Sequence, residues 1–271
     1  MKYKLVAVDM DGTLLDNRKI IPEANIDALY RARKNGVRVI FSTGRVLESA
    51  LSYATAIDYE VDVVGSNGAI TAYQDRHKSF HLPKDEVFRY GKKCEEIGLK
   101  YLIITEEASY YFNNFEYYHY FYKDNEMVQT SKVVEKEAFH SLEEIRSRLD
   151  RENIIKMDIF GTDPDKMKTA VRQINGEKVN VIQPEYNYIE MMHPKASKGN
   201  GVLEIAGYYG VHPKEIVTIG DSGNDISMFQ IGGVSVAMGN AEASVKKHTK
   251  MTTDTNENCG VAKVLKQLAL I

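Results

Sequence analysis

Two aspartates stand near the start of the chain, directly after a short apolar run. The run is Leu5–Val8, and the segment that follows it holds Asp9, Asp11, Gly12 and Thr13. Two carboxylates at positions i and i+2 of a loop just after a buried strand are expected to point the same way. Carboxylate oxygens are ligands of hard divalent cations, so this strand end could hold a cation or a phosphoryl group.

Polar residues also follow two other runs that read as buried strands. They are Thr43, Gly44 and Arg45 after Val37–Ser42, and Asp221, Asn224 and Asp225 after Ile216–Ile219. In open parallel sheets, ligands bind beyond the carboxyl ends of the strands. Four aspartates that converge there would repel one another unless a cation lay among them. Mg²⁺ fits, because it prefers oxygen ligands and completes its shell with a substrate phosphate.

Composition limits the class of protein. The chain has 271 residues, 43% of them hydrophobic and 27% charged, with a formal net charge of −3, which is typical of a globular protein of more than one domain. This charge gives no basic surface for nucleic acid, and no apolar stretch is long enough to span a membrane. Cys94 and Cys259 show no disulfide or zinc spacing, so we expect a cytoplasmic protein.

The order of the predicted elements indicates two domains. Strands and helices alternate at both ends of the chain, and the strands are almost wholly apolar, which is typical of a parallel sheet covered on both faces. The strands between them are shorter and more alternating, as in an antiparallel sheet with one open face. We therefore predict an α/β core domain, residues 1–82 and 194–271, and an inserted α+β domain, residues 83–193.

Four motifs in this order resemble those of the haloacid dehalogenase superfamily. The motifs are Asp9 to Thr13, Ser42 to Arg45, Ser197 to Gly199 and Gly220 to Asp225. The large insertion between the second and third motifs is similar to the type IIB cap of the Cof-like sugar-phosphate phosphatases. Asn67 with its neighbours Gly68 and Ala69 also matches that branch. The resemblance covers essentially the whole chain and implies a Rossmann-like parallel sheet with a cap that closes over the active site.

The resemblance implies a role for each motif residue. Asp9 would be the nucleophile that forms an aspartyl-phosphate, and Asp11 would be the general acid and base. The implied ligands of Mg²⁺ are Asp9, Asp11 through its carbonyl, Asp221 and Asp225, and the implied phosphate-binding residues are Thr43, Gly44, Lys198 and Asn224. Ser222 replaces a glycine common in the family, which should be tolerated unless the backbone there needs a positive φ.

Several assignments keep an alternative. Arg45 could bind substrate or pair with a carboxylate, and Glu190 could contact substrate or lie in a buried strand. Asn67 is a candidate site residue only because its segment matches the Cof-like branch. The aromatic segment Tyr110–Tyr122 could bind substrate, pack, or form a dimer contact, so the chain could be a monomer or a homodimer.

The predicted activity is a Mg²⁺-dependent phosphatase of small phosphorylated metabolites, with sugar phosphates as the expected class. A phosphomutase of the same chemistry and a non-catalytic phosphometabolite-binding regulator are the alternatives, and the sequence does not name the substrate.

Overall fold

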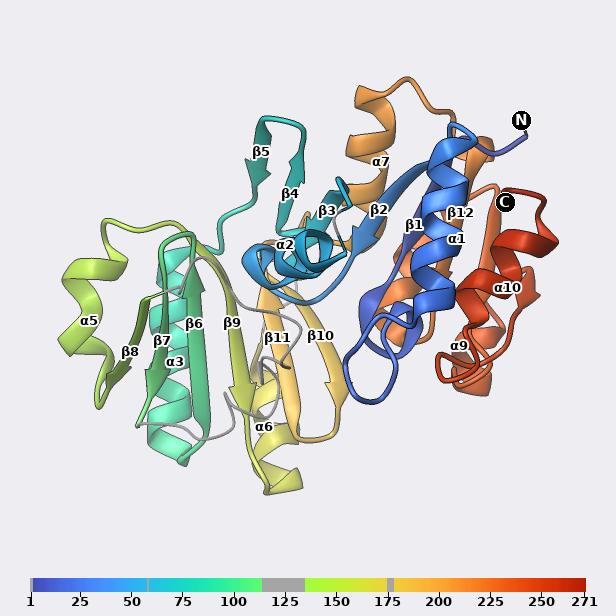
Figure 1. Cartoon of the computed structure of the whole chain (residues 1–271). Coiled ribbons are helices and arrows are strands. Elements are labelled where there is room, and N and C mark those ends of the chain that lie inside the picture. Colours follow the sequence, from blue (N-terminus) through green and yellow to red (C-terminus); the bar gives the residue numbers. More distant parts are fainter. Residues whose placement is uncertain (1, 58, 114–134, 175–177) are drawn as a thin grey trace. The chain divides into compact units, whose positions relative to one another are not determined.

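The computed structural model describes residues 2–57, 59–113, 135–174 and 178–271 (Figure 1). The chain forms two compact units. The first, called the core unit below, comprises the described residues up to Lys78 together with Ser197–Ile271. The second, called the inserted unit, comprises the described residues from Ser79 to Ala196. Among the described residues, no helix has the length and apolar character needed to cross a membrane.

The core unit contains an eight-stranded sheet with the strand order β14-β13-β12-β1-β2-β3-β4-β5. The strands are β1 Leu5–Val8, β2 Arg38–Ser42, β3 Asp62–Gly65, β4 Ile70–Tyr73, β5 Arg76–Ser79, β12 Ile216–Gly220, β13 Val234–Ala237 and β14 Met251–Thr252. The strands from β14 to β3 pair in parallel, whereas β4 runs antiparallel to β3. Because β1 lies between β12 and β2, the carboxyl ends of these three strands are neighbours.

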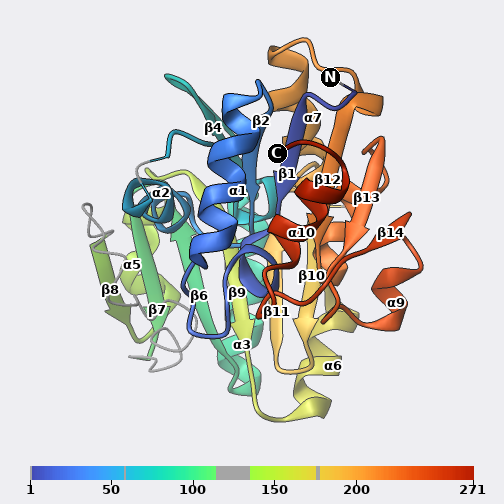
Figure 2. The same cartoon turned by 45° about the vertical axis from the view of Figure 1, so that its right-hand side comes forward.

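Helices cover both faces of the core sheet. Val6 and Val8 pack on the side of α1 Glu23–Lys34, α2 Leu47–Ala56 and α10 Gly260–Gln267. Leu5 and Ala7, which alternate with them along β1, pack on the side of α7 Lys198–Tyr208, α8 Ile226–Phe229 and α9 Ala243–Lys246. Figure 2 shows α1 and α10 together on one face. Burial on both faces explains why β1 is apolar along its whole length.

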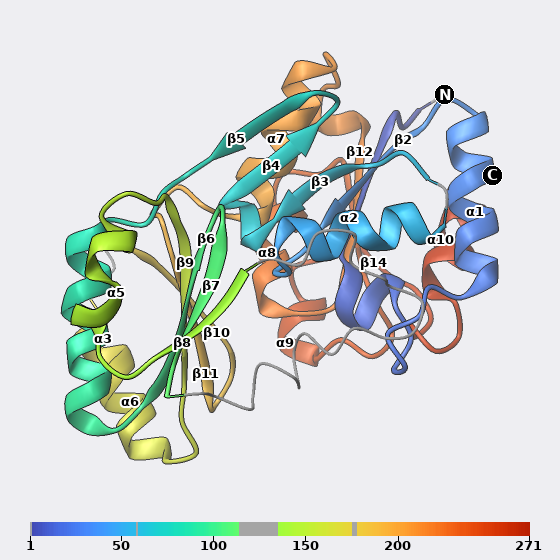
Figure 3. The same ribbon diagram turned by 60° about the vertical axis from the view of Figure 1, so that its left-hand side comes forward.

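The inserted unit contains a six-stranded sheet with the order β10-β11-β9-β6-β7-β8. Its strands are β6 Lys100–Thr105, β7 Ala108–Phe112, β8 Glu135–Phe139, β9 Ile154–Phe160, β10 Asn180–Glu185 and β11 Tyr188–Met192. All its pairs are antiparallel except β7 with β8. The helices α3 Lys84–Ile97, α5 Leu142–Leu149 and α6 Pro164–Gln173 cover one face (Figure 3).

The structure confirms the predicted parallel core with an inserted α+β unit. The expected open face of the inserted sheet is wrong for β9 and β11, because every residue of both strands is buried. The hairpin β4–β5, the short elements α9 and β14, and the strand β8 are not among the elements predicted from the sequence. Of the aromatic segment, Tyr110–Phe112 lie in β7, whereas residues 114–122 lie outside the described part.

Candidate active site

The turn after β1 places Asp9 and Gly12 at the end of the central strands. The Asp9 backbone N–H still donates to the Ile219 carbonyl of β12, at 2.9 Å. The chain then winds into a tight turn, in which the Leu14 N–H donates to the Asp9 carbonyl at 3.2 Å. Gly12 has φ +75°, and a Cβ atom there would collide with the Asp221 carboxylate. Only glycine allows the turn to approach this carboxylate so closely.

Three carboxylates from distant parts of the sequence gather at this edge of the sheet. Ligand oxygens of Asp9, Asp221 and Asp225 all lie within 4.8 Å of one another. Lys198, the first residue of α7, lies among them: its Nζ donates to Asp9 Oδ1 and to Asp225 Oδ1, at 2.6 Å in each case. The lysine is only 1% exposed, so its charge is balanced by these carboxylates rather than by solvent.

Backbone and hydroxyl groups fix the two carboxylates that follow β12. Asp225 Oδ2 accepts from the backbone N–H groups of Asp221 and Ser222, at 2.9 Å in each case. Asp221 Oδ1 accepts from the Thr13 hydroxyl at 2.9 Å. Ser222 has φ −127°, so the backbone at this position does not need the positive φ that would favour glycine. Backbone N–H groups of the loop itself therefore hold Asp225 in place, and a hydroxyl group from the turn after β1 holds Asp221.

The cluster has an excess of negative charge. Burial raises the pKa of Asp9 well above its ordinary value, and Asp225 and Asp221 raise it further against the effect of Lys198. Burial and Asp225 raise the pKa of Asp221 to about 6. In spite of burial, Asp225 and Asp9 raise the pKa of Lys198. If all three carboxylates were ionised, the ammonium would leave two negative charges unbalanced, and the all-oxygen donor set fits a divalent cation such as Mg²⁺ that would balance them.

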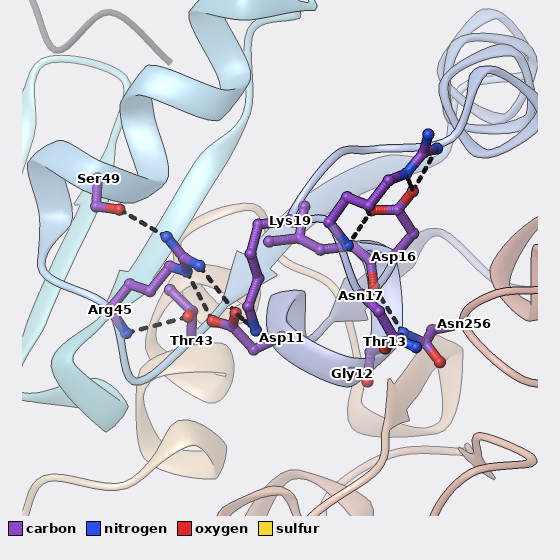
Figure 4. Close-up of polar contacts among 12 residues, drawn as sticks. Asp11, Gly12, Thr13, Asp16, Asn17, Lys19, Thr43, Arg45, Ser49 and Asn256 are labelled. Carbon is purple, nitrogen blue, oxygen red and sulfur yellow. Dashed lines mark hydrogen bonds and ion pairs between the residues drawn. The ribbon is translucent and has the colours of Figure 1, made fainter. Parts of the chain in front are cut away.

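The side chain of Asp11 binds different residues from those that the side chain of Asp9 binds. Arg45 binds it with two hydrogen bonds, Nε to Oδ2 at 2.6 Å and Nη2 to Oδ1 at 2.8 Å (Figure 4). Lys19 Nζ donates to the same Oδ1 at 2.8 Å. Burial alone would raise the pKa of Asp11, but Arg45 and Lys19 hold it well below its ordinary value. The prediction that the carboxylates of Asp9 and Asp11 point the same way is therefore wrong. The chain turns at Asp11 and Gly12, so the two carboxylates bind separate partners.

Loops from three strands connect the residues predicted to bind phosphate. The Asn67 N–H donates to the Thr43 carbonyl at 2.9 Å, and the Arg45 N–H donates to the Thr43 hydroxyl at 3.1 Å. The Asn67 side-chain oxygen accepts from the Asn224 amide at 2.9 Å. A Cβ atom on Gly44 would meet the Asn67 amide. The structure therefore brings Thr43, Gly44, Asn67 and Asn224 into one connected group in the core unit.

Glu190 lies in the inserted unit, on β11. Its Oε1 accepts from Lys156 Nζ and from the Tyr188 hydroxyl, at 2.8 Å in each case. It is buried. A role in substrate contact stays a prediction.

Sequence reasoning missed three contributors to the core cluster. They are the Thr13 hydroxyl on Asp221, Lys19 on Asp11, and Asn240, whose amide donates to the Gly12 carbonyl at 2.8 Å. Thr13 belongs to the first motif, so its position in the sequence could have indicated a contact with the carboxylate cluster. Lys19 and Asn240 lie in polar loops, where their residue types and spacing carry no such signal.

Comparison with known proteins identifies the class. The model of the haloacid dehalogenase-like hydrolase family matches residues 6–265, and the chain belongs to this family. The sequence resemblance is therefore confirmed, and the chain is a hydrolase with a family-typical core.

Individual relatives cover the whole length of the chain. A putative phosphatase of Bacillus subtilis, YxeH, is 28% identical over 99% of this chain and 99% of its own. The 5-amino-6-(5-phospho-D-ribitylamino)uracil phosphatase YitU of the same organism is 28% identical over 98% of this chain and 97% of its own. A solved haloacid dehalogenase-like hydrolase from B. subtilis has a TM-score of 0.85 at 25% identity, covering 99% of this chain and 100% of that one. A subclass IIB sugar phosphatase, with a TM-score of 0.84 at 24% identity, shares the fold over 99% of this chain and 100% of its own.

Proposed function

We propose that the chain is a Mg²⁺-dependent phosphatase that hydrolyses small phosphorylated metabolites of the sugar-phosphate class through an aspartyl-phosphate. The general class, a phosphatase of the haloacid dehalogenase-like hydrolase family, follows from the family match and the relatives. The metal, the substrate class and the residue roles are the proposal. The observation that supports it best is the group of Asp9, Asp221 and Asp225 around buried Lys198.

The reaction would begin at Asp9. A carboxylate oxygen of Asp9 forms a bond to phosphorus while the bond from phosphorus to the alcohol oxygen breaks. Because Arg45 and Lys19 lower the pKa of Asp11, Asp11 would first have to take up a proton from solvent before it gives that proton to the departing alcohol. In the second step the ionised Asp11 takes a proton from the water that hydrolyses the aspartyl-phosphate. A Mg²⁺ ion held by Asp9, Asp221, the Asp11 carbonyl and Asp225 would offset the negative charge that otherwise repels the phosphate. Lys198 keeps Asp9 oriented and, with Thr43, Gly44 and Asn224, would bind phosphoryl oxygens.

The substrate class is supported by a relative. YitU is named for a ribityl compound phosphorylated on its sugar-alcohol chain. Such a substrate is a primary phosphate ester of a poor leaving alcohol, for which an acid such as Asp11 is needed. A cytoplasmic location and a monomeric or homodimeric state remain part of the proposal, and both cysteines are free thiols.

Asp9→Asn tests the mechanism. The variant should lose at least ~10³-fold in turnover of an aryl phosphate, because an amide is a poor nucleophile toward phosphorus. Its circular dichroism spectrum and thermal unfolding should remain those of a folded protein. Full activity in this variant, or in the unmodified protein with excess chelator, would refute the mechanism.

A second experiment separates the alternatives. A phosphatase releases inorganic phosphate from a sugar monophosphate without a bisphosphate activator, whereas a phosphomutase returns an isomeric sugar phosphate. A regulator would bind one ester in calorimetry and turn over none of a broad panel of phosphate esters. The presence of Asp9 and Asp11 together favours an enzyme over a regulator, because a binding protein needs neither a nucleophile nor an acid.

A further inference from the structure

Lys19 lies outside the four family motifs, yet its ammonium group contacts the proposed acid and base. Its Nζ lies 2.8 Å from Asp11 Oδ1 (Figure 4). The same carboxylate is bound by Arg45 at both oxygens. Two cations therefore hold one carboxylate from two directions. The carboxylate still has 38% of its side-chain surface exposed, so it is oriented without being enclosed.

The loop that carries Lys19 is closed by Asp16. The buried Asp16 carboxylate accepts from the backbone N–H groups of Arg18 and Ile20, at 2.9 and 3.0 Å. The Lys19 N–H donates to the Asp16 carbonyl at 2.9 Å. Lys19 itself has φ +62°, a conformation that costs a side-chain-bearing residue about 1 kcal/mol or more. The turn thus holds the backbone of Lys19 in a disfavoured conformation.

Tyr53 of α2 supports both cations. Its hydroxyl donates to the Lys19 carbonyl at 2.9 Å, and the Arg45 guanidinium lies 5.1 Å from the centre of its ring. Arg45 is further fixed by the Ser49 hydroxyl, at 3.2 Å from its Nη1. The two groups that hold Asp11 therefore depend on a common buried side chain, although they come from different segments.

We propose that Lys19, supported by Tyr53, is a positioning residue that fixes the carboxylate of Asp11 for proton transfer to the leaving alcohol. Orientation matters because a general acid must reach the leaving oxygen within hydrogen-bonding distance in the transition state. Arg45 binds both oxygens of the carboxylate, and Lys19 adds a second donor to Oδ1 from another segment of the chain. Lys19 also lowers the pKa of Asp11, so it favours the acid only where better orientation outweighs that effect. The inference rests on the proposed phosphatase function and assigns a residue that no motif contains.

The test compares two leaving groups in Lys19→Met. The parameter kcat/KM is measured for an alkyl phosphate, whose departure needs a proton, and for a nitrophenyl phosphate, whose departure does not. We expect kcat/KM for the alkyl ester to fall roughly tenfold more than for the aryl ester, as part of the general-acid contribution is lost. Lys19→Arg should restore most of the difference, and Tyr53→Phe should show the same selectivity with a smaller effect.

Arg18→Met is the matched control. Arg18 is the neighbouring cation of the same loop, but its guanidinium binds Asp16, so its removal should leave the ratio of the two esters unchanged. Equal losses with both esters in Lys19→Met, no loss, or a gain with the alkyl ester would overturn the inference alone. Absence of turnover of either ester by the unmodified protein with Mg²⁺ would overturn the proposed function together with it.

Discussion

Each unit of the molecule contains a buried lysine between two carboxylates. In the core unit, Lys198 lies 2.6 Å from both Asp9 and Asp225. In the inserted unit, Lys156 lies 3.0 Å from Asp158 and 2.8 Å from Glu190. Both lysines are 1% exposed. Residue types and burial alone would therefore assign the two clusters the same role.

The two clusters differ in where they lie on their sheets. The core cluster lies where β1 and β12 end, and free backbone N–H groups of the following loop bind Asp225. The inserted cluster lies inside strands, with Asp158 and Glu190 opposite each other on β9 and β11. There the backbone groups are used in the sheet, and the Asp158 carboxylate has the Lys156 ammonium as its partner, at 3.0 Å.

The clusters also differ in charge. The third carboxylate, Asp221, leaves the core cluster with an excess of two negative charges, which a divalent cation can balance. Lys156 with two carboxylates leaves an excess of one, and a proton on Asp158 is enough to remove it. Burial raises the pKa of Asp158 to about 7, with Glu190 adding to the effect of burial and Lys156 opposing it. The third carboxylate therefore makes the core cluster the candidate for a divalent cation, whereas a single proton can balance the inserted cluster.

The largest expected effect comes from removing each lysine. Lys198→Met and Lys156→Met should each lower the free energy of unfolding by about 3–5 kcal/mol, because each leaves buried carboxylates without their cation. Mg²⁺ should restore much of the loss in Lys198→Met, since the ion can take over the balancing of charge, and little in Lys156→Met. Thermal unfolding followed by circular dichroism, with and without Mg²⁺, measures this difference.

The unmodified protein is the reference for this comparison. Its melting temperature should rise with Mg²⁺ by the same amount as that of Lys156→Met, whose core cluster is intact. An equal effect of Mg²⁺ on both lysine variants would contradict the distinction between the clusters. Lys198→Met should also lose turnover of an aryl phosphate in Mg²⁺, so recovery of stability without recovery of activity would assign the lysine a chemical role.

Asp158→Asn tests the inserted cluster through pH. Because the pKa of Asp158 is about 7 in the folded protein, against an ordinary value of 3.8, the folded state favours the protonated form. Its contribution to stability is full below about pH 4 and is lost as pH rises toward 7, by on the order of 4 kcal/mol. The asparagine variant resembles the protonated form, so it should be more stable than the unmodified protein at pH 8 and nearly equal at pH 4. Chemical denaturation at a series of pH values checks this.

The comparison of the unmodified protein with Asp158→Asn is necessary, since Asp9 and Asp221 also have raised pKa values and lower the stability over a similar range. That part is common to both proteins and cancels in the difference. A difference in unfolding free energy that does not change between pH 4 and 8 would mean that folding does not shift the pKa of Asp158.

The sequence predicted much of the core site because its motifs follow the ends of strands. In the sheet order β12-β1-β2, strands distant in sequence are neighbours, so Asp9, Thr43 and Asp221 reach one edge. The partners of Asp11 were not predictable, because they depend on the turn at Gly12 and on the backbone of Lys19. The order of polar and apolar residues suggested an open face on the inserted sheet, and only the pairing of β9 with β11 shows that its charges are buried together.

Some short elements could not be predicted from the sequence, for physical reasons. The strand β5 Arg76–Ser79 is polar and mostly exposed, so it lacks the apolar alternation that identifies a strand. The strand β14 has two residues and the helix α9 has four, which is too few for a periodic pattern. Their stability comes from contacts with the rest of the core unit rather than from local sequence.

The smallest expected effect comes from two hydroxyl groups that bind a carboxylate in each cluster. The Tyr188 hydroxyl donates to Glu190 at 2.8 Å, and the Thr13 hydroxyl donates to Asp221 at 2.9 Å. Tyr188→Phe and Thr13→Val should each lower the free energy of unfolding by about 1 kcal/mol, the usual value of one buried hydrogen bond. Urea denaturation of both variants measures the loss.

Only the core variant should also affect the metal. Thr13→Val frees the Asp221 carboxylate to rotate, so the dissociation constant for Mg²⁺, measured by calorimetry, should rise by up to roughly tenfold. Tyr188→Phe should leave it unchanged, since its carboxylate belongs to the cluster that a proton balances. If the two variants bound Mg²⁺ equally well, the Asp221 carboxylate would not depend on Thr13 for its orientation, and the Thr13 hydroxyl would contribute only to stability, as the Tyr188 hydroxyl does.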